Sequence, residues 1–345
     1  MSENPIPSPA ATKELEKKIS LSFESKKMIL QLEREVAALD WQVTDRFGTV
    51  PSLAAPAEHL LASGGKRVRP LLVCLLSRAL KIPFAELSAC AVSAELVHTA
   101  TLLHDDVLDG AHTRRGRITA HLKYNAHTAI LSGDALLSKA ISDIAELNAP
   151  EILKRLAQTV RELVEGECLQ ADLMGQVHSE VDTILEIARR KTASLFAWSA
   201  WVVGHRAREY ADDLFRFGTH LGLAFQVLDD ILDWESAETG KELFQDLSEA
   251  KLNSVGARLV QTSSDAEKIL KAAFATMDAH GTIATSKDLG HSLRLLKEYP
   301  DALAWARQEA NHHSAFAIAH LEKIPPSDWR DLTISITKQL LERMK

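Results

Sequence analysis

The stretches TLLHDDVLDG at residues 101–110 and AFQVLDDILDW at residues 224–234 carry the same acidic pattern, DDxxD, within apolar sequence. The two patterns begin at Asp105 and at Asp229, 124 positions apart. A carboxylate in an apolar setting is costly unless it is paired or binds a cation. Six aspartates that interrupt two hydrophobic segments therefore indicate a cavity that holds cations.

The rest of the chain reads as one helix after another. It has 345 residues, of which 46% are hydrophobic, enough to bury a large core. Apolar residues recur at helical spacing, and short breaks with Gly or Pro, such as 63–70 and 148–150, separate the segments. No long alternating strand pattern and no long linker interrupts them. The sequence predicts an all-α fold, with 1–12 as a disordered tail and 13–345 as a single helical domain.

Charge and composition exclude several classes of function. The net charge is −7, so a nucleic-acid partner is not indicated. The N-terminal sequence lacks the apolar segment of a signal peptide, and no stretch of about 18 residues is free of charge. The three cysteines form no CxxC pair, which fits a reducing compartment. We expect a cytoplasmic protein with at most peripheral membrane contact.

The spacing of each pattern places its outer aspartates on one helix face, because residues four apart are neighbours on a helix surface. On an ideal helix, His98 lies about 20° from Asp105. The stripe of the first pattern comprises His98, Thr101, Asp105 and Asp109. The stripe of the second comprises Phe225, Asp229 and Asp233, with Gln226 at its margin.

Like charges on one helix face repel, and a divalent cation relieves the repulsion. Oxygen ligands without a His-Cys cluster suit Mg²⁺ rather than Zn²⁺. Mg²⁺ usually binds through one or two carboxylates together with substrate phosphates. The two patterns therefore predict Mg²⁺ sites that take a phosphorylated ligand; the alternative is two solvated acidic helix faces.

Basic residues accompany the acidic patterns. The segment GGKRVRP at 64–70 joins two glycines, which let the backbone approach an anion, to Lys66 and Arg69 at the start of a helix. Arg114 and Arg115 follow the first pattern, and guanidinium groups bind phosphate through paired hydrogen bonds. The further candidates are Lys191 and Thr192 in a helical stretch, and Lys241 and Lys251 after the second pattern. This alternation of acidic and basic clusters predicts a diphosphate site.

Four segments, GGKRVRP, LLHDDVLDGAHTRRG, KTASLF and FQVLDDILD, resemble in this order the trans-isoprenyl diphosphate synthases, or polyprenyl synthetases, over roughly residues 45–260. The resemblance implies an all-α bundle around a deep central cavity, usually a homodimer. It implies a prenyltransferase that condenses isopentenyl diphosphate with an allylic diphosphate, using about three Mg²⁺ ions per site. We find no Ser-His-Asp or Cys-His arrangement, so no protein nucleophile is expected.

The resemblance also assigns roles residue by residue. The implied metal ligands are Asp105, Asp109, Asp229 and Asp233, and ionisation of the allylic diphosphate would depend on the first three. The implied ligands of isopentenyl diphosphate are Lys66, Arg69, His98 and Arg115. The implied residues of the allylic diphosphate site are Arg114, Lys191, Thr192, Gln226, Lys241 and Lys251, with Thr192 and Gln226 near the reacting carbons.

Product length in this family depends on the floor below the first pattern. A bulky residue four or five positions before the pattern stops chain growth. Thr101 and Ala100 stand at these positions, and both are small. We therefore expect a medium-to-long-chain product of C20 or more, although residues one turn deeper, such as Leu96 and Val97, could still impose a stop.

The segment GKELFQDLSEAKLNSV at 240–255 departs from the family pattern. Phe244 and Ala250 stand where glycines are usual, and 253–255 reads Asn-Ser-Val where Thr-Leu-Pro is usual. Closure of this segment, and its effect on activity, therefore stay open. Three alternatives remain beside the long-chain synthase: a short-chain farnesyl or geranylgeranyl diphosphate synthase, a non-catalytic subunit of a heteromeric synthase, and a terpene cyclase on the same scaffold. The second DDxxD disfavours the cyclase.

Overall fold

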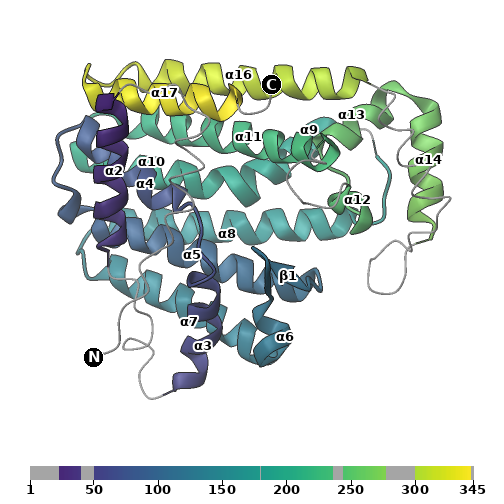
Figure 1. The fold of residues 1–345 in the computed structure, drawn as a ribbon, viewed down its shortest axis with the longest axis horizontal. Coiled ribbons are helices and arrows are strands. Elements are labelled where there is room, and N and C mark those ends of the chain that lie inside the picture. The colour runs from purple at the N-terminus through teal and green to yellow at the C-terminus, as the bar shows by residue number, and fades with distance from the viewer. Residues whose placement is uncertain (1–22, 40–49, 179, 236–243, 277–299, 343–345) are drawn as a thin grey trace. The chain divides into compact units, whose positions relative to one another are not determined.

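The computed structural model describes residues 23–39, 50–178, 180–235, 244–276 and 300–342 (Figure 1). Within these ranges the chain is built of α-helices, with a short β-hairpin, a 3₁₀-helix η2 (Phe84–Glu86) and a π-helix η3 (Arg189–Ala193). The prediction of an all-α fold is confirmed. The predicted tail at 1–12 lies outside the described residues.

The elements are numbered in chain order. The α-helices are α2 (Phe23–Ala37), α3 (Pro51–Leu61), α4 (Val68–Ala79), α5 (Ser88–Leu108), α6 (Ala120–Tyr124), α7 (Ala126–Ala145), α8 (Pro150–Leu173), α9 (Val181–Ala188), α10 (Ser194–Ala207), α11 (Ala211–Glu235), α12 (Gln245–Ser248), α13 (Ser254–Thr262), α14 (Ser264–Phe274), α16 (Pro300–Leu321) and α17 (Asp328–Glu342). The strands are β1 (Thr113–Arg114) and β2 (Arg117–Ile118). None of the helices in the described ranges is long and apolar enough to cross a membrane.

The chain divides into two compact units. Unit 1 takes in Met1–Val160, Trp198–Phe215 and Glu322–Ser335, and unit 2 takes in Arg161–Ala197, Arg216–Leu321 and Ile336–Lys345. Boundaries between the units fall inside α8, α10, α11 and α17. This division does not test the single domain predicted for 13–345, which stays a prediction. The first Asp pattern belongs to unit 1 and the second to unit 2, and each is described within its own unit.

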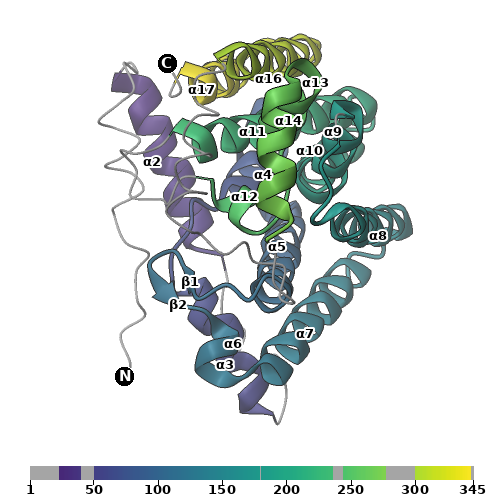
Figure 2. The same cartoon turned by 90° about the vertical axis from the view of Figure 1, so that its right-hand side faces the viewer.

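Unit 1 is organised around α5, which lies against α7, α3 and α4 (Figure 1, Figure 2). The contact between α5 and α7 is close, because a Cβ at Gly133 would lie 2.2 Å from Nε2 of His104. The same His104 nitrogen lies 3.0 Å from the carbonyl oxygen of Ile130. Both helices bury apolar side chains, among them Leu96, Val97, Ala100, Leu103, Leu136, Ala140 and Ile144. This packing holds the end of α5 that carries the first Asp pattern.

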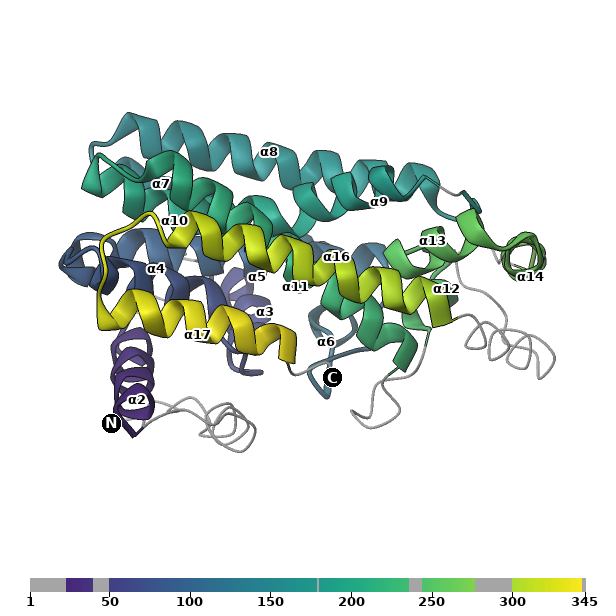
Figure 3. The same ribbon diagram turned by 90° about the horizontal axis from the view of Figure 1, so that it is seen from above.

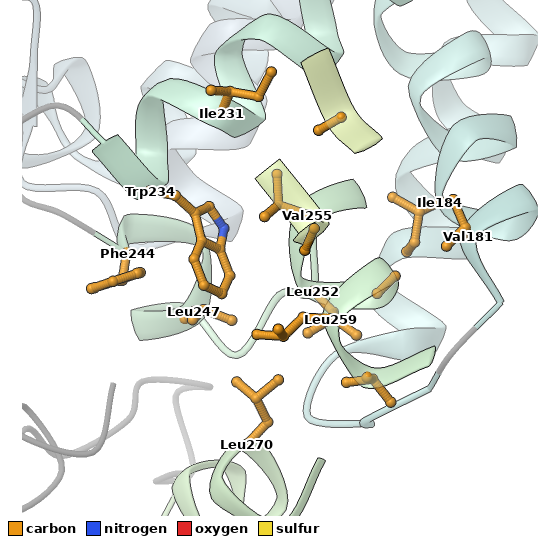
Figure 4. Packing of buried hydrophobic residues seen from close by; sticks show 14 of the residues in the cluster. Val181, Ile184, Ile231, Trp234, Phe244, Leu247, Leu252, Val255, Leu259 and Leu270 are labelled. Carbon is orange, nitrogen blue, oxygen red and sulfur yellow. The ribbon is translucent and has the colours of Figure 1, made fainter. Parts of the chain in front are cut away.

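Unit 2 has a core of its own around Trp234, near the end of α11 (Figure 4). The ring of Trp234 meets Phe244 edge-on, with ring centroids 5.1 Å apart. Helix α13 packs against α16, α14 and α9 (Figure 3). The buried side chains of this core include Val181, Ile184, Ile231, Trp234, Phe244, Leu247, Leu252, Val255, Leu259 and Leu270. Because Trp234 directly follows the second Asp pattern, this core holds the end of α11 in place.

Candidate active site

The first Asp pattern occupies the C-terminal end of α5. Asp105 and Asp106 lie in the last turn, and Asp109 caps it. Negative charge at this end opposes the helix dipole, so the carboxylates destabilise α5 unless cations offset them. Asp106 is buried, with 1% of its surface exposed, whereas Asp105 and Asp109 are half-buried. The middle aspartate therefore acts inside the protein, and the outer two can meet a ligand.

Asp106 is paired with Arg114. Nε of Arg114 donates to Oδ1 of Asp106 at 2.8 Å, and Nη2 lies 2.7 Å from the same oxygen. Burial raises the pKa of Asp106, and the charge and hydrogen bond of Arg114 oppose that rise. The pair joins the end of α5 to the hairpin that follows it. Arg114 was predicted as a ligand of the allylic diphosphate, and the ion pair is a second contact that the sequence did not indicate.

The hairpin places Arg115 in its turn. Strands β1 and β2 pair antiparallel with Arg114 opposite Arg117, which leaves Arg115 and Gly116 as the two turn residues. Both have a positive φ, 53° and 73°, as in the type I′ turns that match the twist of a hairpin. For Arg115 this left-handed conformation costs about 1–2 kcal/mol. Strain at a charged residue is a pointer to function.

The side chain of Arg115 also contacts the glycine loop that precedes α4. Its Nη1 donates a hydrogen bond to the backbone carbonyl of Gly64. Gly65 has a φ of 150°, and a Cβ there would lie 2.7 Å from Nη1 of Arg115. Any side chain at this position would displace the guanidinium, which explains the second glycine of GGKRVRP. Lys66 follows with an exposed side chain.

Four arginines surround His98 in unit 1. Burial lowers the pKa of His98 well below its ordinary value, and the charges of Arg69, Arg115, Arg67 and Arg114 lower it further. Burial likewise lowers the pKa of Arg69 to about 10, and the charge of Arg115 adds to this effect. The guanidinium groups thus repel one another and keep His98 neutral. An anion bound here would relieve the repulsion.

Glu95 is a buried carboxylate among these arginines that sequence reasoning missed. It is 2% exposed and pairs with Arg67, with Nη1 and Oε1 2.5 Å apart. Its charge raises the pKa of Arg69 and of Arg115 against the effect of burial. The signal in the sequence was a single glutamate within an apolar stretch, the same kind of signal that marked the Asp patterns.

The two small residues predicted as the chain-length floor differ in exposure. Thr101 is half-buried on α5, one turn before Asp105, and its hydroxyl donates to the carbonyl of His98 at 2.9 Å. Ala100 is fully buried. Thr101 is therefore the better candidate for contact with a product chain, and Ala100 belongs to the packed side of α5.

The second Asp pattern occupies the C-terminal end of α11. Here too the middle aspartate, Asp230, is buried, whereas Asp229 is exposed and Asp233 is half-buried. Oδ1 of Asp233 accepts a hydrogen bond from the backbone N–H of Gln245 at 2.8 Å. Burial raises the pKa of Asp233 to about 6; the backbone N–H groups of Gln245 and Asp246 oppose this rise, and the charges of Asp230 and Asp229 add to it. A bound cation would favour the ionised carboxylate.

Thr192 and Gln226, predicted to lie near the reacting carbons, are hydrogen-bonded to each other. Oγ1 of Thr192 donates to Oε1 of Gln226 at 2.6 Å, and Nε2 of Gln226 donates to Oδ1 of Asp230 at 2.9 Å. Thr192 belongs to the π-helix η3, a rare geometry that is frequent at functional sites. The structure thus brings the segments KTASLF and FQVLDDILD together within unit 2.

Lys191 of η3 is paired with side chains of α8. Its Nζ forms an ion pair with Glu167 and donates to Oε1 of Gln170 at 2.6 Å. A Cβ at Gly166 would lie 2.7 Å from Cβ of Arg190 and 3.0 Å from the backbone nitrogen of Lys191, so glycine is what lets η3 approach α8. The sequence did not single out Gly166, Glu167 or Gln170, because their roles depend on how two helices pack.

Two positions of the 240–255 segment where glycines are usual have a left-handed backbone in the described part, 244–255. Phe244 and Ala250 adopt a positive φ of 62° and 53°, a conformation that glycine reaches without strain. The ring of Phe244 is buried against Trp234, so aromatic packing offsets the strain. The departure at Phe244 is therefore accommodated by packing in the folded chain.

Of the two lysines predicted after the second pattern, the structure describes only Lys251. Lys251 is 7% exposed, and its Nζ donates to Oε2 of Glu249 at 2.9 Å. Its backbone N–H donates to the carbonyl of Asp246 at 2.8 Å. A role in binding diphosphate would require Lys251 to leave this buried position. Lys241 lies outside the described residues.

The chemistry of the donor set fits Mg²⁺ bound together with a diphosphate. Over the described ranges, no group of three or more His, Cys, Asp or Glu side chains gathers closely enough to hold a metal ion. Mg²⁺ is usually held by one or two carboxylates, with phosphate oxygens and waters completing its shell. The outer aspartates of each pattern can supply such carboxylates. Oδ2 of Asp233 is also buried without a hydrogen-bond partner among the described residues, as a metal-binding oxygen would be.

Comparison with known proteins identifies the family. The profile of the polyprenyl synthetase family matches residues 50–286, more than half of the chain. A prenyl transferase of Cyanophora paradoxa is 34% identical over 302 residues, which cover 85% of this chain and 90% of the relative. The chain belongs to the polyprenyl synthetase family. It is a prenyltransferase.

Two further similarities extend over nearly the whole chain. An all-trans-nonaprenyl-diphosphate synthase (geranyl-diphosphate specific) of Rhodobacter capsulatus is 31% identical, covering 92% of this chain and 98% of the relative. A crystal structure of a polyprenyl synthase from Caulobacter crescentus CB15, complexed with calcium and isoprenyl diphosphate, superposes with a TM-score of 0.78 at 28% identity. The match covers 99% of this chain and 100% of that chain.

Proposed function

We propose that this chain condenses isopentenyl diphosphate with an allylic diphosphate in a Mg²⁺-dependent reaction and forms an all-trans polyprenyl diphosphate of C20 or longer. Membership of the family supports the reaction class. The name of the Rhodobacter relative, a nonaprenyl-diphosphate synthase, supports a long product. The observation that carries the proposal is that each Asp pattern buries its middle aspartate and leaves its outer aspartates exposed or half-buried.

The outer aspartates of the two patterns would hold the metal ions. They are Asp105, Asp109, Asp229 and Asp233. Bound Mg²⁺ would neutralise the charge that develops on the diphosphate as the allylic C–O bond breaks. The Caulobacter structure, which contains calcium and isoprenyl diphosphate, supports this combination of a divalent cation and a diphosphate.

The arginine cluster of unit 1 would bind the diphosphate of isopentenyl diphosphate. Arg69, Arg115 and neutral His98 lie within this cluster, and Lys66 lies on the adjacent glycine loop. Mutual repulsion among the guanidinium groups would be relieved when the anion binds. Arg114, which keeps a third of its side chain exposed, and Lys191 would hold the allylic diphosphate from their ion-paired positions.

Neutral dipoles would stabilise the allylic cation. The hydroxyl of Thr192 and the amide of Gln226 are hydrogen-bonded to each other, so their dipoles are oriented before substrate binds. Such preoriented dipoles stabilise developing charge without forming a bond to it. The π electrons of isopentenyl diphosphate would then attack the allylic cation and form the new C–C bond, and the resulting cation would lose a proton to the departed diphosphate. No protein nucleophile takes part.

An assay of the purified chain alone tests this proposal. The chain is incubated with Mg²⁺, isopentenyl diphosphate and C5, C10 or C15 allylic diphosphates, and products are separated by chromatography after removal of the diphosphate. Polyprenols of C20 or longer are expected, and chelation of Mg²⁺ abolishes them. A sole C15 product would contradict the chain length, and cyclic hydrocarbons would indicate a terpene cyclase. Product formed only with a partner protein would indicate a subunit of a heteromeric synthase.

Assembly is a separate part of the proposal. The family resemblance implies a homodimer, and light scattering on the purified chain measures its mass in solution. A mass twice that of the 38.0 kDa chain is expected. A monomer with full activity would contradict this part and leave the proposed reaction intact.

A further inference from the structure

The buried carboxylate of Asp230 accepts hydrogen bonds from two residues, Ser254 and Gln226. Its Oδ2 accepts a hydrogen bond from the hydroxyl of Ser254 at 2.6 Å and another from the backbone N–H of Ser254 at 3.0 Å. Its Oδ1 accepts from Nε2 of Gln226 at 2.9 Å. Asp230 is 4% exposed and Ser254 is 1% exposed. Both oxygens are thus engaged inside unit 2, which distinguishes Asp230 from the outer aspartates of its pattern.

A chain of hydrogen bonds links Thr192 through Gln226 to Asp230, and each donor in it points toward Asp230. Nε2 of Gln226 donates to Asp230, so the carbonyl oxygen of Gln226 faces Thr192. A carbonyl oxygen can only accept, and the hydroxyl of Thr192 therefore donates its proton to it at 2.6 Å.

The direction of these hydrogen bonds determines which part of the Thr192 hydroxyl faces a ligand. Because its proton is donated to Gln226, a ligand meets the lone pairs of Oγ1. Lone pairs of a neutral hydroxyl stabilise positive charge on a nearby carbon. The opposite orientation would present the proton, which suits a diphosphate oxygen and disfavours a cation.

We propose that Ser254 is a positioning residue for this reaction: by holding Asp230 it orients Gln226 and directs the lone pairs of Thr192 toward the allylic cation. The inference rests on the proposed function, which places Thr192 near the reacting carbons. Ser254 would act through three hydrogen bonds: from Ser254 to Asp230, from Gln226 to Asp230 and from Thr192 to Gln226.

Ser254 is a feature of this chain. It lies in the segment 253–255, which departs from the Thr-Leu-Pro that is usual in the family, and a leucine side chain could not donate to Asp230. The preceding Asn253 caps α13 by accepting from Gly256 N–H at 3.1 Å, and it accepts from Nε1 of Trp234 at the same distance. The start of α13 is thereby anchored to the core, so Ser254 is held rigidly against Asp230.

The test compares Ser254→Ala with a matched control, Ser263→Ala. Ser263 caps the next helix, α14, by accepting from Ala266 N–H at 3.2 Å, and it has no place in the site. We expect Ser254→Ala to lower kcat about tenfold, with KM for both diphosphates changed less than about twofold. Ser263→Ala should lower the thermal midpoint of unfolding to a similar extent and leave kcat unchanged. Ser254→Thr, which restores the hydroxyl, should recover most of the lost kcat.

A double-mutant cycle identifies the path of the effect. If Ser254 acts through Thr192, then Ser254→Ala added to Thr192→Val should lower kcat by less than about twofold beyond Thr192→Val alone. Independent losses that multiply would overturn the inference, as would a Ser254→Ala enzyme with the kcat of the Ser263→Ala control. If Ser254→Ala does not fold, Ser254→Cys keeps the volume, weakens the donor and should show the same pattern at smaller amplitude.

Failure of the proposed function gives a different result. In that case the folded wild-type chain forms no prenyl product with any primer, whatever residue stands at 254. A wild-type chain that condenses the substrates while the Ser254 variants match the control refutes the positioning role and leaves the proposed function in place.

Discussion

Arg114 donates a hydrogen bond from Nε to Oδ1 of Asp106 at 2.8 Å, and Asp106 is the buried middle aspartate of the first DDxxD pattern. Asp230 takes the corresponding position in the second pattern, where Gln226 and Ser254 replace the arginine as donors. In both patterns the middle carboxylate ties a neighbouring segment to the end of its helix. The outer carboxylates are the proposed metal ligands, so under this proposal a single five-residue pattern combines a structural and a chemical role.

The different environments of the middle and outer aspartates predict that substitution of Asp106 lowers stability, whereas substitution of its neighbour Asp105 lowers activity. Asp106→Asn removes the charge that faces Arg114 and should lower the free energy of unfolding by about 1–3 kcal/mol. Asp105→Asn should change the free energy of unfolding by less than about 0.5 kcal/mol, because it also removes a charge that opposes the helix dipole. It should nevertheless lower Mg²⁺-dependent kcat by about 100-fold or more. Urea unfolding and steady-state kinetics measure both; equal loss of stability in the two variants would contradict this prediction.

Gly166→Ala tests the contact between α8 and η3. The added Cβ would lie 2.7 Å from Cβ of Arg190 and 3.0 Å from the backbone nitrogen of Lys191. We expect a loss of about 1–3 kcal/mol in the free energy of unfolding from overpacking. Because Lys191 moves with η3, KM for the allylic diphosphate should rise more than KM for isopentenyl diphosphate. The control is Cys168→Ala, an exposed site on the same helix, which should match wild type. An equal KM for the allylic diphosphate in Gly166→Ala and wild type would contradict a role of Lys191 in binding that substrate.

Thr101→Phe tests the chain-length floor. Thr101 is half-buried one turn before Asp105, so a phenyl ring there should block the growing chain and shift the products to shorter polyprenols. Thr101→Ala serves as the control, since it keeps the position small and should retain the long product. Ala100→Phe is expected to act differently: Ala100 is fully buried, and overpacking there should cost about 1–3 kcal/mol of stability. An unchanged product distribution in a folded Thr101→Phe enzyme would place the floor elsewhere.

A half-buried pair of histidines, one on α11 and one on α16, is expected to make the stability of the protein depend on pH. His220 of α11 and His313 of α16 approach with their Nδ1 atoms 3.0 Å apart. Burial lowers the pKa of each to about 4. Additional charges that face the pair come from His312, His320, Arg216 and Glu309. In the unfolded chain a histidine has a pKa of about 6.5, so between that pH and about 4 the unfolded state binds more protons. The free energy of unfolding should therefore fall as the pH is lowered through this window.

Thermal unfolding between pH 7 and 4 measures this effect. The double variant His220→Gln, His313→Gln should show a flatter dependence of the midpoint on pH than wild type. His127→Gln, at an exposed histidine, should retain the wild-type slope. Parallel curves for the double variant and wild type would show that other groups govern the acid sensitivity.

The candidate site residues were predicted from the chemistry of single residues, which is local information, whereas their contacts depend on the fold. The glycines of GGKRVRP were predicted to allow close approach of an anion, and in the structure Gly65 allows close approach of Arg115. Lys251 was predicted in the allylic diphosphate site, and a sequence does not show that it lies buried against Glu249. The departures at Phe244 and Ala250 left closure in doubt, since a sequence does not show that Trp234 packs on Phe244 and offsets the strain of its left-handed backbone.

The sequence by itself determined the all-α fold and the family, and it predicted that the outer aspartates of each pattern share one helix face, because helical periodicity and motif spacing are properties of neighbouring residues. Only the tertiary structure decided which aspartate of each pattern is buried and what holds it. The hydrogen bonds from Ser254 to Asp230 span 24 positions, and the bond from Thr192 to Gln226 spans 34. Such contacts form only when packed helices bring distant residues together, and burial then decides whether a carboxylate serves as an internal acceptor or stays available to a cation.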